Sequence, residues 1–297
     1  MKFLITGGAG FIGSHLARRL SARASVTVLD DLSTGKKENL AGIDCTLLQG
    51  SILDPAPLAE ACAGATHVFH LAALVSVPES VAHPARCHEM NVEGTRRVLA
   101  AAAQAGAQRL VLASSCAVYG NEPTMPKTET SPVAPASPYA NSKLEGEKLC
   151  TAGPLSAVAL RFFNVYGPRQ DPRGPYAAAV PKFLEAARTG APLTIFGEGH
   201  QTRDFVYIDD VTAALEHAAL SPAMSGIYNV ASGHSVSVLH LAEVVLALTG
   251  LRSEIRHAPV RAGDILHSAA SIAKIRSAGW NPSFDLAAGL KKILSAG

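Results

Sequence analysis

Short apolar runs alternate with longer stretches of helical composition through the first half of the chain. Each run is four or so residues long and is followed by a turn or a helical stretch. The runs that predict strands are residues 3–6, 26–29, 46–48, 68–71, 109–112 and 158–161. Residues 14–20 and the alanine-rich residues 92–105 have the composition of helices between them. This alternation predicts an α/β fold with a Rossmann-type, doubly wound parallel sheet.

The pattern changes after Asn164. Residues 167–175 are rich in Pro, Gly and Arg, which is typical of a loop. Further helices are expected at 177–189, near the end of 206–219, at 238–248 and at 286–294, and strands at 193–196 and 227–230. We therefore predict a second, smaller mixed α/β domain interleaved with the first. The expected division is 1–165 plus 204–232 for the Rossmann domain, and 166–203 plus 233–297 for the smaller domain.

Composition excludes several classes of function. The chain has 297 residues, 48% hydrophobic and 17% charged, which suits a globular protein with a sizeable core. A net charge of +2 with dispersed Lys and Arg gives no reason to expect nucleic acid or a membrane as partner.

The spacing of cysteines and histidines and the first residues of the chain indicate the cellular compartment. Five scattered cysteines without a C-x-x-C pair suit a reducing cytoplasm, and the eleven histidines show no metal-ligand spacing, so no metal is expected. Only Met1 and Lys2 precede the first strand, and no apolar run reaches the roughly 20 residues of a membrane helix. We expect a cytoplasmic protein.

A glycine-rich loop follows the first predicted strand and precedes the first predicted helix. Its sequence is GGAGFIG, residues 7–13. Gly7 and Gly10 allow a tight turn and a close approach of backbone N–H groups to a diphosphate, and Gly13 lets helix and strand pack closely. The plain alternative is a glycine turn without a ligand. The strand before, the helix after and the acid that ends the second strand favour a dinucleotide-binding loop.

Asp30 is that acid. A carboxylate at this place accepts the adenosine ribose hydroxyls and repels a 2′-phosphate, which favours NAD over NADP. Lys36 and Lys37 lie deeper in the following loop and are expected to be solvated.

Tyr139 and Lys143 lie four residues apart on a helix that Pro138 can start, so they project from one face. An ammonium beside a phenol favours the phenolate, which can act as a base. Lowering a tyrosine pKa from ~10 to about 7 needs roughly 4 kcal/mol, which a lysine and an oxidised nicotinamide ring could supply together. Ser115 follows a predicted strand and could share a substrate hydrogen bond. Alone, the pair could be a solvated helix face and the serine a turn cap; the glycine loop favours the catalytic interpretation.

Ten motifs in order resemble those of the extended short-chain dehydrogenases/reductases, and within them nucleotide-sugar epimerases of the UDP-glucose/UDP-N-acetylglucosamine 4-epimerase type. The resemblance runs essentially end to end. The motifs are GGAGFIG, DDLSTG, HLAALVSVPES, NVEGT, SSCAVYG, SPYANSK, RFFNVYGPRQDP, GEGHQTRDFVYIDDV, YNVASG and RAGDILHS. It implies tightly bound NAD, a UDP-sugar substrate, and a homodimer formed through a four-helix bundle that includes the Tyr139 helix.

The resemblance also assigns site residues. It makes Ser115, Tyr139 and Lys143 the catalytic trio. The implied NAD contacts are Gly7, Gly10, Phe11, Ile12, Asp30, Leu32, Ser33, Thr34, Gly35, Ser51, Ile52, Leu71, Ala72, Ala73, Tyr139 and Lys143. The implied substrate contacts are Ser115, Tyr139, Asn164, Thr194, Phe196, Arg203, Arg261, Asp264 and Ser268. Core packing accounts equally well for Thr194 and Phe196. Ser51 departs from the pattern, because relatives often have an aspartate there that contacts the adenine.

The implied reaction is reversible inversion at C4 of a UDP-hexose. Tyr139 takes the 4-hydroxyl proton, hydride passes to NAD, and the 4-keto sugar turns before the hydride returns. Related dehydratases need an Asp-Glu pair after the active-site hydroxyl, where this chain has Cys116 and Ala117. Two alternatives stay open: 4-epimerisation of UDP-glucuronate or a UDP-pentose, and a non-catalytic NAD-binding regulator.

Ser268 is relevant to the range of UDP-sugars that the protein accepts. By the family pattern a tyrosine at this position restricts the pocket to plain hexoses, whereas a small residue leaves room for a 2-acetamido group. The serine therefore predicts that UDP-N-acetyl sugars are accepted too. The alternative is a loop serine without consequence for specificity.

Overall fold

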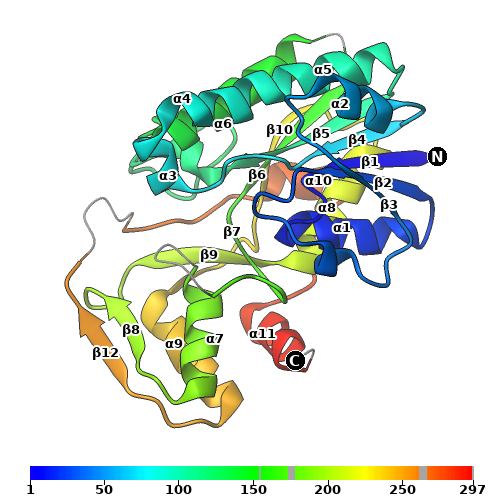
Figure 1. Cartoon of the computed structure of the whole chain (residues 1–297). Coiled ribbons are helices and arrows are strands. Elements are labelled where there is room, and N and C mark those ends of the chain that lie inside the picture. Colours follow the sequence, from blue (N-terminus) through cyan, green and yellow to red (C-terminus); the bar gives the residue numbers. More distant parts are fainter. Residues whose placement is uncertain (154, 173–177, 261–265, 296–297) are drawn as a thin grey trace.

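The computed structural model describes residues 1–153, 155–172, 178–260 and 266–295. Its centre is a seven-stranded parallel sheet of order β10-β6-β5-β4-β1-β2-β3 (Figure 1). The strands are β1 (Lys2–Thr6), β2 (Ser25–Asp30), β3 (Thr46–Gln49), β4 (His67–His70), β5 (Arg109–Ser115), β6 (Ala157–Phe162) and β10 (Gly226–Val230). The predicted Rossmann-type sheet is confirmed.

Helices cover both faces of this sheet (Figure 1). One face packs against α1 (Phe11–Ser21) and α8 (Ile208–Leu220), the other against α2 (Pro55–Cys62), α5 (Gly94–Gln104) and α6 (Pro138–Ala152). Successive residues of a strand alternate between the two cores: Leu110 and Leu112 of β5 face α5 and α6, and Val111 faces the other side. Burial on both faces explains why these strands are continuous apolar runs.

Short helices and turns lie in the connections between these elements. They are α3 (Val77–Ala82), α4 (Pro84–His88), the π-helical η2 (Glu89–Glu93), and the 3₁₀ turns η1 (Lys37–Leu40) and η3 (Cys116–Tyr119). The helix predicted at 92–105 begins inside η2 and continues as α5.

A smaller region is built from two small sheets. One has the order β11-β9-β7, the other pairs β12 with β8. The strands are β7 (Asn164–Tyr166), β8 (Leu193–Phe196), β9 (Thr202–Tyr207), β11 (Ser235–Ser237) and β12 (Ile255–Ala258). The helices of this half are α7 (Ala179–Thr189), α9 (Val238–Thr249), α10 (Ala273–Ser277) and α11 (Leu286–Ser295).

The predicted division into domains stays a prediction. Strand β9 runs across the expected boundary at 203/204, and α10, which lies in the expected smaller domain, packs against β10 of the large sheet. Both features show how closely the two parts are interleaved.

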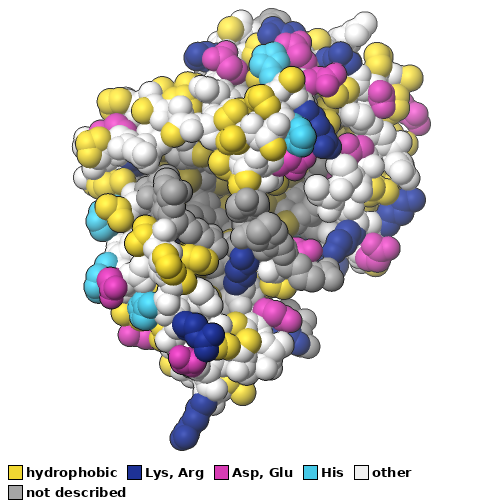
Figure 2. All heavy atoms as spheres, turned by 60° about the vertical axis from the view of Figure 1, so that its left-hand side comes forward, with side chains coloured by type: hydrophobic (Ala, Val, Ile, Leu, Met, Phe, Trp, Pro, Cys, Tyr) yellow, Lys and Arg dark blue, Asp and Glu magenta, His cyan; other side chains and the backbone are white. Residues whose placement is uncertain are grey.

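Two properties concern possible partners. Within the described ranges, every helix is too short or too polar to span a lipid bilayer. Figure 2 shows Lys and Arg side chains interspersed with Asp and Glu side chains over the face it displays, so the described residues of that face form no block of like charge.

Candidate active site

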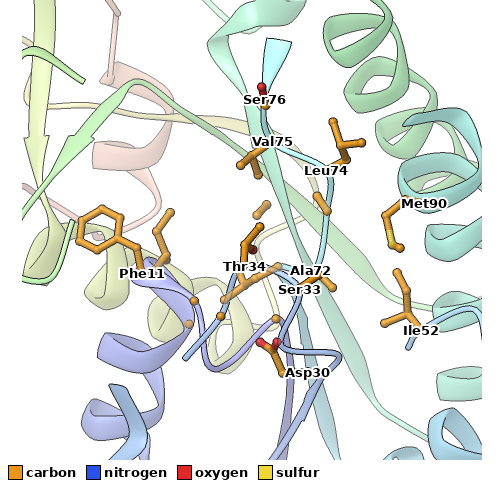
Figure 3. Close-up of a pocket in the computed structure, with 18 of the residues that line it drawn as sticks. Phe11, Asp30, Ser33, Thr34, Ile52, Ala72, Leu74, Val75, Ser76 and Met90 are labelled. Atoms are coloured by element: carbon orange, nitrogen blue, oxygen red, sulfur yellow. The ribbon is translucent and has the colours of Figure 1, made fainter. Parts of the chain in front are cut away.

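A cavity of about 680 Å³ lies at the carboxyl ends of β1, β2, β4 and β5 (Figure 3). In an open parallel sheet this is where ligands bind. Fifteen sequence-predicted residues line it together: Gly7, Gly10, Phe11, Ile12, Asp30, Ser33, Thr34, Gly35, Ile52, Leu71, Ala72, Ala73, Ser115, Tyr139 and Lys143. Leu32 and Ser51 are not among the lining residues. The Leu32 side chain packs on the core, and the Ser51 hydroxyl accepts a hydrogen bond from the Leu53 N–H at 3.1 Å.

The glycine loop is packed too tightly for side chains. Gly7 has φ +71°, and a Cβ there would lie 2.7 Å from the Ala72 nitrogen. A Cβ on Gly13 would lie 2.2 Å from the Gly7 carbonyl oxygen. Because α1 begins at Phe11, within this loop, its N-terminal N–H groups face the cavity. The loop therefore fits the diphosphate of a dinucleotide.

Asp30 ends β2 at the floor of the cavity (Figure 3). Its carboxylate accepts hydrogen bonds from the Ala9 and Leu32 N–H groups, both at 2.8 Å. Burial raises its pKa, and these two bonds act in the opposite direction. The carboxylate is thus fixed in orientation where the sequence expects a ribose to lie.

Helix α6, which carries Tyr139 and Lys143, is anchored at its start. Ser137 caps α6 by accepting a hydrogen bond from the Ala140 N–H at 3.1 Å, and Pro138 occupies the first turn. The Tyr139 N–H donates to the Ser80 hydroxyl at 3.1 Å. These bonds fix where the tyrosine enters the cavity.

The trio meets in this cavity. The Lys143 ammonium donates to the Ala113 carbonyl at 2.9 Å and lies 5.8 Å from the centroid of the Tyr139 ring. The Ser115 side chain lies beside Tyr139, where it lowers the pKa of the phenol, and it accepts from the Ala117 N–H at 3.2 Å. Base, ammonium and hydroxyl therefore line one wall.

Burial controls the protonation of the pair. It raises the pKa of Tyr139 to about 12, against the lowering effect of the Ser115 hydrogen bond. It lowers the pKa of Lys143 to about 8, although Cys87 and Glu147 act to raise it. Lys143 alone therefore does not produce a phenolate near neutral pH. Lowering the pKa of Tyr139 towards neutral pH, as expected from the sequence, needs a further positively charged group nearby.

Several residues that support the cavity wall were not predicted from the sequence. The buried Asn91 accepts a hydrogen bond from the Leu74 N–H at 2.7 Å and donates to the Leu74 carbonyl and the Ser142 hydroxyl, both at 2.9 Å. The buried His70 lies between the hydroxyls of Thr6 and Thr95, at 2.8 and 2.9 Å. The feature of the sequence that could have indicated Asn91 and His70 is a polar residue inside an otherwise apolar motif. Further lining residues include Leu74, Val75, Ser76, Met90, Phe163, Val165 and Gln170.

A second cavity of about 300 Å³ adjoins the first, and Val165 lines both. It brings together four residues predicted to bind substrate: Asn164, Thr194, Phe196 and Arg203. The Asn164 amide donates to the Asp204 carbonyl at 3.0 Å, and the Arg203 guanidinium to the Thr202 carbonyl at 2.8 Å. This second cavity is therefore polar on one wall and aromatic on another.

Three other residues were predicted to contact the substrate. Arg261 and Asp264 lie outside the described residues. Ser268 lines neither cavity; its N–H donates to the Thr202 carbonyl at 3.1 Å, one residue from Arg203. In the part of the chain that the structure describes, no cluster of His, Cys, Asp or Glu could hold a metal ion.

Comparison with known proteins gives a consistent result. Residues 3–231 match the NAD dependent epimerase/dehydratase family. UDP-glucose 4-epimerase of Mycolicibacterium smegmatis is 40% identical over 308 residues, which cover 99% of this chain and 97% of that protein. UDP-N-acetyl-alpha-D-glucosaminuronate decarboxylase of Bacillus cytotoxicus is 38% identical over 274 residues, 87% of this chain and 83% of that protein.

Solved structures extend the similarity to the whole fold. UDP-N-acetylglucosamine 4-epimerase from Methanobrevibacter ruminantium, in complex with UDP-N-acetylmuramic acid, superposes with a TM-score of 0.93 at 36% identity and covers 100% of this chain and 99% of that one. UDP-glucose 4-epimerase of Thermus thermophilus, in complex with NAD, has a TM-score of 0.90 at 37% identity, covering 99% and 98%.

Proposed function

The chain belongs to the NAD-dependent epimerase/dehydratase family, and we propose that it inverts C4 of UDP-hexoses. It is an enzyme of the epimerase/dehydratase kind, with NAD as its cofactor. The proposed substrates are UDP-glucose and UDP-galactose, together with UDP-N-acetylglucosamine and UDP-N-acetylgalactosamine. One observation carries the proposal: Ser115, Tyr139 and Lys143 line one cavity with the dinucleotide loop, and that cavity adjoins a second one lined by Asn164 and Arg203.

The cofactor would be held by residues at the floor of the larger cavity. The glycine loop and the start of α1 suit its diphosphate, and Asp30 suits its adenosine ribose. NAD held there would supply a hydride acceptor and donor for C4 of the sugar, and the positive charge of its oxidised ring.

The trio would handle the proton of the 4-hydroxyl group. Tyr139 accepts this proton, and Ser115 shares the hydrogen bond. Lys143, fixed by the Ala113 carbonyl, keeps an ammonium beside the phenol. The burial that raises the Tyr139 pKa also excludes water, which strengthens the effect of every nearby charge.

The second cavity would hold the nucleotide end. Arg203 provides a forked donor for the diphosphate, and Phe196 an aromatic wall for the base. With the nucleotide held there, the hexose can turn in the larger cavity without leaving the enzyme. This freedom to turn is what inversion at C4 requires.

Cys116 and Ala117 favour epimerisation over dehydration or decarboxylation. Burial raises the pKa of the Cys116 thiol to about 11, and Ala117 has no ionisable group. The residues after Ser115 therefore offer no acid/base pair that could shuttle protons at neutral pH.

The decisive experiment is NMR of the product mixtures formed from UDP-galactose, UDP-N-acetylgalactosamine and UDP-glucuronate by the NAD-loaded protein. Epimers of the first two are expected. Turnover of UDP-glucuronate alone would favour the uronate alternative. NAD binding without any product would identify a non-catalytic regulator.

Ser268 tests the proposed substrate width. Ser268→Tyr should spare UDP-galactose turnover and suppress UDP-N-acetylgalactosamine turnover, because by the family pattern a tyrosine at this position restricts the pocket to plain hexoses. Ser268→Thr, a small replacement, should retain both activities. Equal loss of both activities in Ser268→Tyr would contradict the proposed role.

We also propose a homodimer formed through a bundle that contains α6. In its support, α5 and α6 pack side by side on one face of the sheet (Figure 1). Light scattering of the purified protein should give twice the chain mass of 30.8 kDa. A monomer at assay concentration would contradict the proposal.

A further inference from the structure

A buried ion pair lies directly behind the catalytic lysine. Glu147 follows Lys143 by four residues on α6, and it is 1% exposed. Its two carboxylate oxygens accept hydrogen bonds from Arg161 Nε at 2.8 Å and Arg161 Nη2 at 2.7 Å. Arg161, on β6, is 2% exposed. Neither residue lines the larger or the second cavity.

The pair belongs to a series of bonds between α6 and the end of β5. The Ala113 carbonyl accepts from Lys143, and the Ser114 hydroxyl donates to Glu147, while Ser115 lies beside Tyr139. Three consecutive residues of one strand thus lie against three residues spaced one turn apart on one helix. Arg161 is the register partner of Ser114 across β5 and β6, so it closes this series from the neighbouring strand.

Resting on the function proposed for Tyr139 and Lys143, we infer that the Glu147–Arg161 pair is a positioning element for this reaction. It fixes the rotation of α6 against β5, and it places a carboxylate next to Lys143 so that the ammonium persists beside Tyr139. A purely structural pair would only join the helix to the sheet.

The titratable groups around Lys143 support the inference that the Glu147 carboxylate keeps the lysine protonated. They are Tyr139 and Glu147 on α6, the Cys87 thiol on α4 and His70 on β4. Burial lowers the pKa of His70 to about 3, so this imidazole is neutral at working pH. Among these groups Glu147 is the carboxylate, and it opposes the lowering of the Lys143 pKa by burial.

The test uses a double variant, Glu147→Leu with Arg161→Met. Glu147→Gln alone would leave a buried guanidinium unpaired and is expected to unfold easily, whereas replacing both partners by apolar residues of similar volume is tolerated in other buried pairs. Arg19→Met with Glu216→Leu is the control, because this more exposed pair, which Arg23 also joins, links two elements and its residues line neither cavity.

The readout is the titration of the Tyr139 phenol, followed by tyrosinate absorbance with and without NAD. The chain has six tyrosines, so the titration of the corresponding Tyr139→Phe protein is subtracted. The double variant should titrate about one pH unit higher than the wild type, with a roughly tenfold lower turnover at neutral pH that recovers as the pH rises. The control pair should titrate as the wild type.

An unchanged midpoint and pH profile in the double variant would overturn the inference. Should that variant fail to fold, Ser114→Ala decides instead: it removes one donor to Glu147 and should shift the midpoint in the same direction by less, and no shift overturns the inference. If the wild type lacks epimerase activity, the proposed function fails, while the titration still tests the positioning role.

Discussion

Replacing Lys143 by methionine should raise the pH at which Tyr139 becomes an effective base. Methionine keeps much of the length of the side chain and removes its charge. The ammonium lies 5.8 Å from the centroid of the phenol ring. At an effective dielectric constant of about 20, a unit charge at this separation is worth about 3 kcal/mol, or about two pKa units.

The sign follows from which protonation state is active. In the proposed reaction the phenolate is the base, and a neighbouring cation favours this form. Loss of that cation raises the pKa of Tyr139, so activity at a fixed pH below that pKa falls. We expect a loss of about 100-fold in kcat near neutral pH, recovering about tenfold for each unit of rising pH.

The assay is kcat for UDP-galactose as a function of pH, with NAD content measured in each sample. Tyr139→Phe is the control, since it removes the base and should show no recovery at high pH. An unshifted acidic limb in Lys143→Met, with normal NAD content, would refute the electrostatic role of the lysine.

Three further predictions concern the cofactor site and stability. Gly13→Ala should lower the free energy of unfolding by about 1–3 kcal/mol and reduce NAD content, because its Cβ would lie 2.2 Å from the Gly7 oxygen; Gly10→Ala, with a nearest approach of 3.3 Å, should cost less in thermal denaturation. Asp30→Asn should weaken NAD binding by roughly 10- to 100-fold and reduce the preference for NAD over NADP. Calorimetry measures both affinities, and an unchanged ratio of the NAD and NADP dissociation constants would contradict the role of the Asp30 charge. His70 has a folded-state pKa of about 3, below its unfolded value, so its contribution to stability is complete above pH ~6.5 and is lost as the pH falls towards 3. Denaturant titrations of His70→Gln should therefore show a smaller loss of unfolding free energy between these pH values than the wild type. An equal loss would contradict the low pKa of His70.

Much of the fold was predictable from the sequence because the large sheet is buried on both faces. Its strands are therefore continuous apolar runs, and the runs at 3–6, 26–29 and 109–112 lie within β1, β2 and β5. The short strands β7, β9, β11 and β12 were not predicted. They contain polar residues such as Asn164 and Arg203, and pairing with distant segments stabilises them.

Local spacing placed the dinucleotide loop and the Tyr139–Lys143 pair, because a strand–turn–helix and a single helical turn each lie within a few residues. It gave no information on Glu147 and Arg161, whose ion pair joins positions 14 residues apart through the packing of α6 on β6. The sequence by itself thus determined the glycine loop and the Tyr139–Lys143 pair, whose residues lie close together along the chain. Only the tertiary structure decided the protonation of this pair, because a pKa depends on burial and on the charges that folding brings near, as the raised value of Tyr139 shows.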